Sequence, residues 1–137
     1  MNRYANSTIK GFLYQFEKTL NTILTTPDEE SEITVEGIED IDVNDTAGVQ
    51  QLIQCKYHEQ LEKFTLSNIE KPILQMLEHW GSSSQSSNIS YVLFCYFPDK
   101  TRETLKLNKK DLENFIDKDT PTVLIKIKNN IRNIINQ

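Results

Sequence analysis

The stretch Glu36–Lys56, EGIEDIDVNDTAGVQQLIQCK, decides the fold, because two short runs in it alternate with the two-residue period of a β-strand. In the first run Ile41 and Val43 share one side, and Asp40 and Asp42 share the other. The second run separates in the same way into an apolar and a polar side: Ile53, Cys55 and Tyr57 against Gln54, Lys56 and His58. Residues 44–48 between the runs are turn formers, which predicts a hairpin-like return. Pairing the runs would gather an acid, an amide and an ammonium on one polar patch above an apolar underside.

The composition limits the class of protein. The chain has 137 residues, 37% of them hydrophobic and 26% charged, which is typical of one soluble globular domain over residues 1–137. No apolar run has the length of a membrane span, and the start, MNRYANSTIKG, lacks the apolar core of a secretion signal. We therefore expect no membrane partner. Cys55 and Cys95 lie in strand-like apolar runs and are expected to be reduced core residues, which favours a cytoplasmic protein.

The net charge and the end of the chain add two expectations. A formal charge of −5 argues against a protein that coats nucleic acid by charge alone, but it is compatible with a nuclease, because metal-binding carboxylates add local negative charge. The chain stops inside a helix-like run, NNIRNIINQ, without a closing signal. We therefore expect it to be the amino-terminal part of a longer protein.

Residues 8 to about 25 have the clearest helical pattern. Seven apolar residues follow the three-and-four spacing of one buried stripe: Ile9, Phe12, Leu13, Phe16, Leu20, Ile23 and Leu24. Ser7 or Thr8 is expected to cap the start of this helix, and Pro27 prevents its continuation. Glu17 lies at the rim of the stripe, where a carboxylate is most often solvated.

The middle of the chain predicts two further strands and a helix. Residues 33–35 open a strand, and Gly37 allows a bend, so residues 32–44 form either one bent strand or two. Ser67 and Glu70 match a capping box before a helix with a buried face made of Ile69, Ile73, Leu74, Leu77 and Trp80. Because Pro72 fits only a first turn, the regular helix is expected to start nearer Lys71, after a looser turn.

The second half predicts how the sheet is completed. Residues 89–97 are nearly all apolar, aromatic or β-branched, which predicts a strand buried on both faces and, after a long helix, parallel to its neighbour. Residues 81–88, GSSSQSSN, predict a polar loop. Helices are expected over residues 107–115 and 122–136, although the second of these segments also alternates like a strand at its start. The order of elements predicts an α/β fold with a central mixed sheet flanked by helices.

The polar patch has the residue types of a metal-dependent phosphodiesterase. Phosphodiester cleavage needs a hard cation, a positioned water and a group that stabilises the developing charge. Magnesium takes oxygen ligands and often only one or two from protein, so Asp42 and Gln54 are the candidate metal ligands. Lys56, on the same strand side as Gln54, would reach the attacking water or the phosphate. Glu36, Glu39 and Asp40 are nearby carboxylates that would supply the charge that a glutamine lacks.

Other interpretations of the same residues are less specific. A polar strand face of Asp, Gln and Lys is also common on exposed sheets, where it has no chemical role. Two histidines and two cysteines without close spacing do not predict a zinc site. The sequence has neither a Gly-rich phosphate loop nor a G-x-S-x-G nucleophile turn.

Three segments together resemble the PD-(D/E)xK nuclease superfamily: GFLYQ at residues 11–15, VEGIEDIDV at 35–43 and IQCK at 53–56. More narrowly, they resemble the Mrr-like restriction nucleases and the amino-terminal effector endonucleases of bacterial anti-phage defence proteins. Those include double-stranded DNA endonucleases associated with cyclic-oligonucleotide signalling and nuclease domains fused to sensor ATPases. The resemblance covers roughly residues 8–97 and implies a restriction-endonuclease-like fold.

The resemblance assigns roles to residues of this chain. It implies Asp42 as the metal aspartate, Gln54 as the glutamine that replaces an acidic third position, and Lys56 as the catalytic lysine. Glu17 matches more loosely a helix carboxylate that some members carry. The chain departs from the Mrr pattern because Glu39-Asp40 stands where a Gly-rich turn precedes the aspartate. The choice between Asp40 and Asp42 as the main ligand therefore stays open, with Asp42 preferred.

The function that the resemblance implies is a Mg²⁺-dependent endonuclease of double-stranded DNA, with Mn²⁺ as an alternative ion and RNA as an alternative substrate. Activation is expected through homo-oligomerisation by regions outside this chain, with a sensor or regulatory domain in the same longer protein. The glutamine in the third motif position and the net acidity favour an alternative: a catalytically silent nuclease-fold scaffold or partner-binding module.

Overall fold

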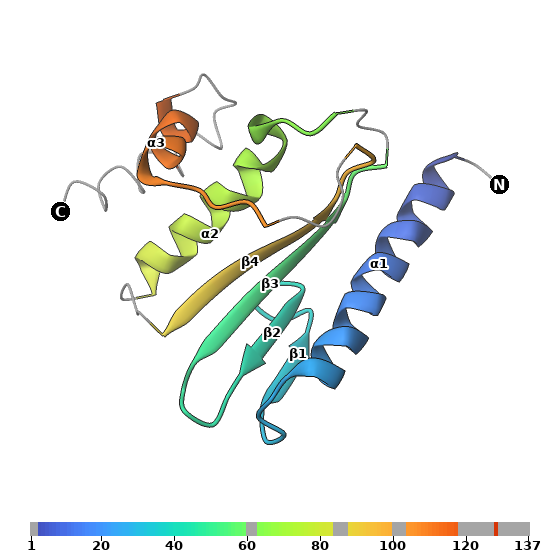
Figure 1. Ribbon diagram of the computed structural model, residues 1–137, viewed down its shortest axis with the longest axis vertical. Helices are drawn as coiled ribbons and strands as arrows, with labels where there is room; N and C mark the ends of the chain where they lie inside the picture. Colours follow the sequence, from blue (N-terminus) through green and yellow to red (C-terminus); the bar gives the residue numbers. More distant parts are fainter. Residues whose placement is uncertain (1–2, 60–62, 84–87, 100–103, 118–127, 129–137) are drawn as a thin grey trace. The chain divides into compact units, whose positions relative to one another are not determined.

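The computed structural model describes residues 3–59, 63–83, 88–99, 104–117 and 128. They fall into two compact units, Met1–Lys63 with Ser87–Asp99 and Phe64–Ser86 with Lys100–Gln137. The first unit holds the amino-terminal helix and a β-sheet, and the regular elements among the described residues of the second unit are helices (Figure 1). The site predicted from the sequence therefore belongs to the first unit.

The first unit contains a four-stranded mixed sheet in the order β1-β2-β3-β4. Its strands are β1 (Glu32–Val35), β2 (Ile41–Asn44), β3 (Gln50–Tyr57) and β4 (Ile89–Tyr96). β1, β2 and β3 pair antiparallel, and β4 pairs parallel with β3. The predicted hairpin and the predicted parallel strand are confirmed, and residues 32–44 form two strands and not one bent strand.

The turns that connect these strands have clear local causes. Between β2 and β3, Asp45 Oδ1 accepts the backbone N–H groups of Ala47 and Val49, and Gly48 takes a positive φ of 83° that suits glycine. Between β1 and β2, Glu36 takes a φ of 56°, which is uncommon for a residue with a side chain, and its N–H donates to Asp40 O at 2.9 Å. The turn between β1 and β2 matters most for the site, because it leads into Asp42.

The register separates the sheet into two faces. Ile41 pairs with Ile53, and these residues form an apolar cluster with Val43, against which Ile33, Cys55, Val92 and Phe94 pack. Asp42 pairs with Leu52, so its side chain is on the opposite face, together with Gln54 and Lys56 at two-residue steps along β3. We call these the Cys55 face and the Lys56 face.

The prediction that β4 is buried on both faces was wrong. Its residues are half-buried, and Ser90 and Tyr96 are exposed, whereas Phe97, directly after the strand, is buried. β4 ends the strand order of the described sheet, so only one of its edges pairs with a neighbouring strand. An apolar sequence predicts a strand well, but an edge position limits how deeply that strand is buried.

The amino-terminal helix, α1 (Arg3–Thr25), begins five residues before the predicted start, so Ser7 and Thr8 lie inside it and do not cap it. Its predicted burial was also wrong. The apolar stripe is exposed, with Phe12 64% and Leu24 83% accessible, while Thr19 and Thr22 on the other side are buried. The hydroxyls of these two threonines donate to the helix carbonyls of Gln15 and Lys18, which makes their burial tolerable.

The Cys55 face of the sheet explains why α1 packs against it with the side opposite to the apolar stripe. Tyr14 stacks on Phe94 at 4.8 Å between ring centroids and 10° between planes, and also contacts Tyr57 and Tyr96. Lys18 Nζ lies 4.5 Å from the centroid of the Phe94 ring. The helix lies along the sheet (Figure 1). Aromatic stacking and a cation–π contact attach it there, where the sequence predicted burial of the apolar stripe.

The second unit contains a 3₁₀-helix η1 (Leu66–Ile69), α2 (Glu70–Ser82) and α3 (Lys109–Asp117). The looser turn predicted before α2 is η1, and Pro72 stands in the first turn of α2. The predicted capping box lies two residues earlier, because Asn68 Oδ1 accepts the N–H of Thr65 at 2.9 Å. The helix predicted over residues 107–115 is confirmed as α3.

The interior of the second unit is mostly apolar, with Ile69, Leu74 and Met76 buried. The buried Lys128 forms an ion pair with Glu70, with 3.1 Å between Nζ and Oε1, and this pairing compensates both charges. Except for Lys128, the helix predicted over residues 122–136 lies outside the described residues, as do residues 60–62 and the part of the polar loop at 84–87. Among the described helices, none is both long enough and apolar enough to cross a membrane.

Candidate functional site

Asp42 is the most constrained residue of the candidate site. Its side chain is on the Lys56 face, and only 4% of the residue is exposed. Oδ2 accepts the N–H of Ile38 at 2.6 Å, and Oδ1 accepts the N–H of Glu39 at 2.9 Å. The β1–β2 turn therefore holds the carboxylate in one orientation and satisfies its charge in part.

Gly37 allows this close approach between the turn and the carboxylate. A Cβ atom at residue 37 would lie 2.2 Å from Asp42 Oδ2 and 3.2 Å from Thr34 Cγ2. No side chain fits there unless the carboxylate moves away from the amides. The sequence suggested only a bend at Gly37. The signal that could have predicted the turn is the spacing of Asp42, which follows Ile38 by four residues and Glu39 by three and accepts the N–H groups of both.

Gln54 carries an unusual polar atom. Its Oε1 is buried, and within the described part of the chain it has no hydrogen-bond donor. A buried amide oxygen without a donor costs roughly 1–3 kcal/mol. Such an atom in an otherwise well-bonded strand indicates a place where a ligand, ion or water completes the bonding.

Lys56 and the acidic residues before β2 form an electrostatic cluster. Burial raises the pKa of Glu39, the charges of Asp40 and Asp42 raise it further, and the charge of Lys56 lowers it. These effects place the carboxylates of Asp40 and Asp42 and the ammonium of Lys56 within electrostatic reach of Glu39. Glu39 was only a neighbouring carboxylate in the sequence, and its central position depends on the shape of the turn.

Asp40 differs from Asp42 in what it contacts. Its Oδ2 accepts the backbone N–H of Cys55 at 2.8 Å, so its carboxylate adjoins β3 between Gln54 and Lys56. Asp42 is bonded only to its own turn by the described hydrogen bonds. Both carboxylates keep further acceptor capacity, because an ionised carboxylate has about four lone-pair sites.

The two other accessory candidates lie elsewhere. Glu36 is exposed and accepts a hydrogen bond from Gln15 Nε2 of α1 at 2.6 Å. Glu17 is exposed on α1, and α1 packs against the Cys55 face, not the face of Asp42. The structure thus brings Asp40, but neither Glu36 nor Glu17, to the Gln54–Lys56 segment.

His58 makes an aromatic contact and is a poor candidate for a catalytic acid or base. Its ring stacks on Phe97 at 4.6 Å between centroids. Burial lowers its pKa, and the charge of Lys56 lowers it further, so the imidazole is neutral at pH 7.

Whether these residues suit a metal ion depends on their donor atoms. Among the described residues, no group of three or more His, Cys, Asp or Glu side chains gathers in a metal-binding arrangement. An ion that needs several protein ligands, such as structural zinc, is therefore not supported by this part of the chain. Magnesium needs fewer, and the oriented Asp42 carboxylate with the unpaired Gln54 oxygen fits an ion that keeps most of its ligands as water and phosphate.

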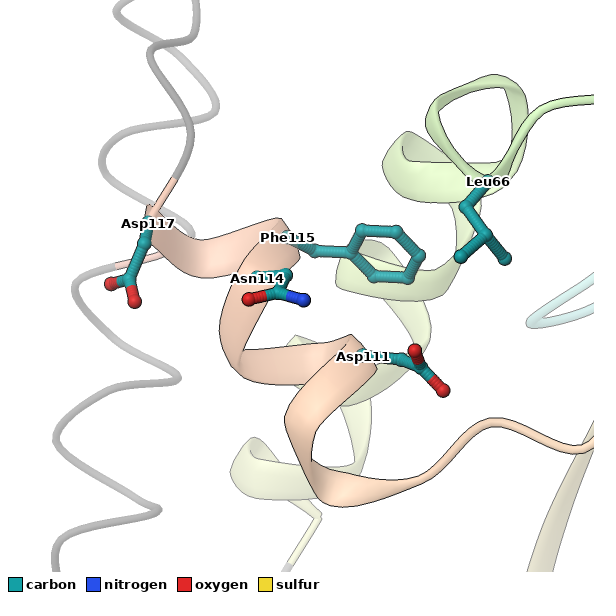
Figure 2. Close-up of a pocket in the computed structure, with 5 residues that line it drawn as sticks. All are labelled: Leu66, Asp111, Asn114, Phe115 and Asp117. Carbon is teal, nitrogen blue, oxygen red and sulfur yellow. The ribbon is translucent and has the colours of Figure 1, made fainter.

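A pocket in the second unit is a weaker candidate. Figure 2 shows its lining, which is Leu66 with four residues of α3: Asp111, Asn114, Phe115 and Asp117. Asp111 belongs to the helix cap, since its Oδ2 accepts the N–H of Asn108 and its own N–H donates to Asn108 Oδ1. Among the described residues, the lining has two carboxylates and no cationic side chain that would neutralise a phosphate.

Comparisons with known proteins add nothing to this geometry: no family model, curated protein or solved structure matches the chain significantly. Any functional argument therefore rests on the side chains of the first unit.

Proposed function

We propose that this chain is a Mg²⁺-dependent endonuclease domain that hydrolyses phosphodiester bonds of double-stranded DNA. One observation carries the proposal: the buried, unpaired Oε1 of Gln54 shares a sheet face with the oriented carboxylate of Asp42 and with Lys56. An oxygen pair of this kind beside an ammonium suits a hard cation and a phosphate better than it suits a purely structural strand face.

Each residue has a task in this proposal. Asp42 and Gln54 would hold the ion, which supplies charge neutralisation at the phosphate and activates a bound water. Lys56 donates hydrogen bonds to a phosphate oxygen and contributes a positive charge beside it. Asp40, bonded to the N–H of Cys55, orients water near Gln54 and Lys56. The repulsion among Glu39, Asp40 and Asp42 favours cation binding, because a cation relieves it.

The wider context of the proposal follows the family resemblance. The mixed sheet agrees with a restriction-endonuclease-like fold, which we propose for the first unit. The domain would act in the bacterial cytoplasm as the effector of a larger anti-phage defence protein. Since the chain has a net charge of −5, tight DNA binding would need clustering of several copies by a sensor domain in the same protein.

Nicking of supercoiled plasmid DNA tests the activity. We expect little cleavage by the chain alone, and Mg²⁺-dependent nicking when copies are clustered through a carboxyl-terminal oligomerising fusion. Asp42→Ala and Lys56→Ala should each reduce the rate by about 100-fold or more, because each removes a charge that acts at the reacting phosphate. EDTA should abolish nicking, and Mn²⁺ should restore it.

Matched variants control for nonspecific effects of charge. Lys71→Ala and Glu30→Ala remove exposed charges outside the site and should leave the rate unchanged. Nicking that persists in both Asp42→Ala and Lys56→Ala would defeat the proposal. The same substrates made of RNA identify which nucleic acid is cleaved.

One observation favours the alternative of a silent scaffold. Both oxygens of Asp42 already accept turn N–H groups, which gives this residue a structural reason to be acidic. Calorimetry separates the two proposals: an endonuclease binds Mg²⁺ or Mn²⁺ and loses that binding in Gln54→Leu, whereas a scaffold binds neither ion at Asp42.

A further inference from the structure

The outer side of α1 is an apolar surface that nothing in the described chain covers. Seven of its side chains are between 45% and 83% exposed: Ile9, Phe12, Leu13, Phe16, Leu20, Ile23 and Leu24. The surface extends beyond the helix to Val35 of β1, and the two elements together line a groove of ≈ 610 Å³. This α1 face is unlike the isolated exposed leucines that are normal on any protein.

The spacing within the α1 face is that of a helix–helix seam. Ile9, Leu13, Phe16, Leu20 and Ile23 follow one another at steps of four, three, four and three residues. Those steps are the d-a-d-a-d positions of a heptad repeat, through which two helices interlock side chains. Phe12 and Leu24 border the seam and widen it. A helix partner therefore fits the α1 face better than a flat or polar partner does.

The exposed area is large enough for a stable interface. If a fully exposed large apolar side chain offers roughly 200 Å², the seven residues together present on the order of 800 Å² at their observed exposures. The largest apolar patch of an ordinary monomer is about 300–600 Å². One side of a standard protein–protein interface is about 800 Å². The α1 face thus has the area of one half of such an interface.

We propose that the α1 face is covered by the α1 face of a second copy of this chain, with the two helices antiparallel about a two-fold axis. A two-fold axis places the same surface on both sides, so an interface of this kind needs a surface that is complementary to itself. The α1 face meets that condition because its seam contains no charge that would repel its own copy. Lys10, next to the seam, is already paired with Glu59 of the same chain.

The carboxyl-terminal segment of the chain is a less suitable occupant. Residues 122–136 also have an apolar helical pattern, and a segment of that kind would fit a groove. However, Lys128 in the middle of the segment is buried in the second unit and forms an ion pair with Glu70 there. Moving the segment to the α1 face would break this buried ion pair. A second copy requires no such loss.

Sedimentation equilibrium of the full chain tests the proposal. We expect a dimer at micromolar concentration, and we expect the double variant Phe16→Glu, Leu20→Glu to raise the dissociation constant by about 100-fold or more, because it buries like charges in the seam. Both residues are exposed, so the circular dichroism spectrum should not change. As a matched control, Asn21→Glu adds a charge to the exposed surface of α1 outside the seam and should leave the dimer intact.

Cross-linking tests the orientation of the helices. In a Cys55→Ser, Cys95→Ser background, Phe16→Cys at the middle of the seam should form a disulfide between copies under mild oxidation. Ile9→Cys and Ile23→Cys at the two ends of the seam should not, because only a parallel pair would bring each of them next to its own copy. A monomeric wild type at about 100 μM, far above the Kd expected for such an area, would overturn the proposal. So would a dimer that survives Phe16→Glu, Leu20→Glu. Neither measurement reads DNA cleavage, so the dimer and the proposed nuclease stand or fall separately.

Discussion

The two faces of β3 differ sharply although they alternate residue by residue. On the Cys55 face, Ile53 is 2% exposed and packs in the cluster of Ile41 and Val43. On the Lys56 face, Gln54 has a buried oxygen without a donor in the described chain. One face contributes stability through apolar packing, whereas the other keeps polar groups that cost stability. Local cost of this kind is more typical of functional surfaces than of structural ones.

The largest expected effect is the difference in protein stability between a substitution on the Cys55 face and one on the Lys56 face. Ile53→Ala should destabilise the protein by about 3 kcal/mol, since it removes a fully packed side chain from the apolar cluster. Gln54→Leu, the next residue along, should be neutral or stabilising, because it removes a buried oxygen that lacks a donor. Urea unfolding monitored by circular dichroism measures both. If Gln54→Leu destabilised as much as Ile53→Ala, the contrast between the faces would be wrong.

A smaller effect tests what orients Asp42. Gly37→Ala should destabilise by about 2 kcal/mol, because its Cβ displaces the carboxylate from the N–H groups of Ile38 and Glu39. The matched control is Gly11→Ala in α1, where a Cβ meets no atom within 4 Å and should stabilise by about 0.5–1 kcal/mol. Thermal unfolding of the two variants gives the comparison. A Gly37→Ala variant as stable as the wild type would show that the contact between Gly37 and Asp42 has no energetic importance.

The strands of the first unit could be predicted from sequence because they depend on local patterns. The two-residue alternation predicted which residues share each side of β3, and the turn formers at 44–48 predicted the β2–β3 hairpin. The candidate site could be predicted only as far as the side of a strand. The hydrogen bonds that hold Asp42, and the central position of Glu39, depend on a turn in which Glu36 takes a positive φ, and the sequence pattern gave no sign of it.

The orientation of α1 could not be predicted from its own pattern. Amphipathicity indicates that a helix has an apolar side, but not what that side contacts. α2 buries Leu74 as expected, and Met76 in addition, whereas α1 places Tyr14 and Lys18 on the sheet and leaves Phe16 exposed. The difference arises from the partner surface. The Cys55 face presents aromatic rings, which attract a tyrosine and a lysine, and this information lies about eighty residues away in β4.

The smallest expected effect is on the reaction rates of two thiols, Cys55 on one face of the sheet and Cys95 on the other. Burial raises the pKa of Cys55 to about 12, which Lys18 on α1 partly offsets, and raises that of Cys95 to about 11, which Lys56 partly offsets. Because the thiolate is the reactive form, both should react with a disulfide reagent at pH 8 at least about 10-fold more slowly than free cysteine. Both rates should rise with pH up to the respective pKa.

Two lysine variants should affect the reaction rates of the two thiols in opposite ways. Each thiol is measured in a background in which the other cysteine is replaced by serine. Lys56→Met removes the cation that lowers the pKa of Cys95, so it should slow Cys95 by a few-fold, on the order of 3-fold, and leave Cys55 unchanged. Lys18→Met should do the reverse. This crossed result is expected only if Lys18 and Lys56 lie on opposite faces of the sheet. Equal slowing of both thiols by Lys56→Met would mean that the ammonium of Lys56 does not belong to the face of Asp42 and Gln54.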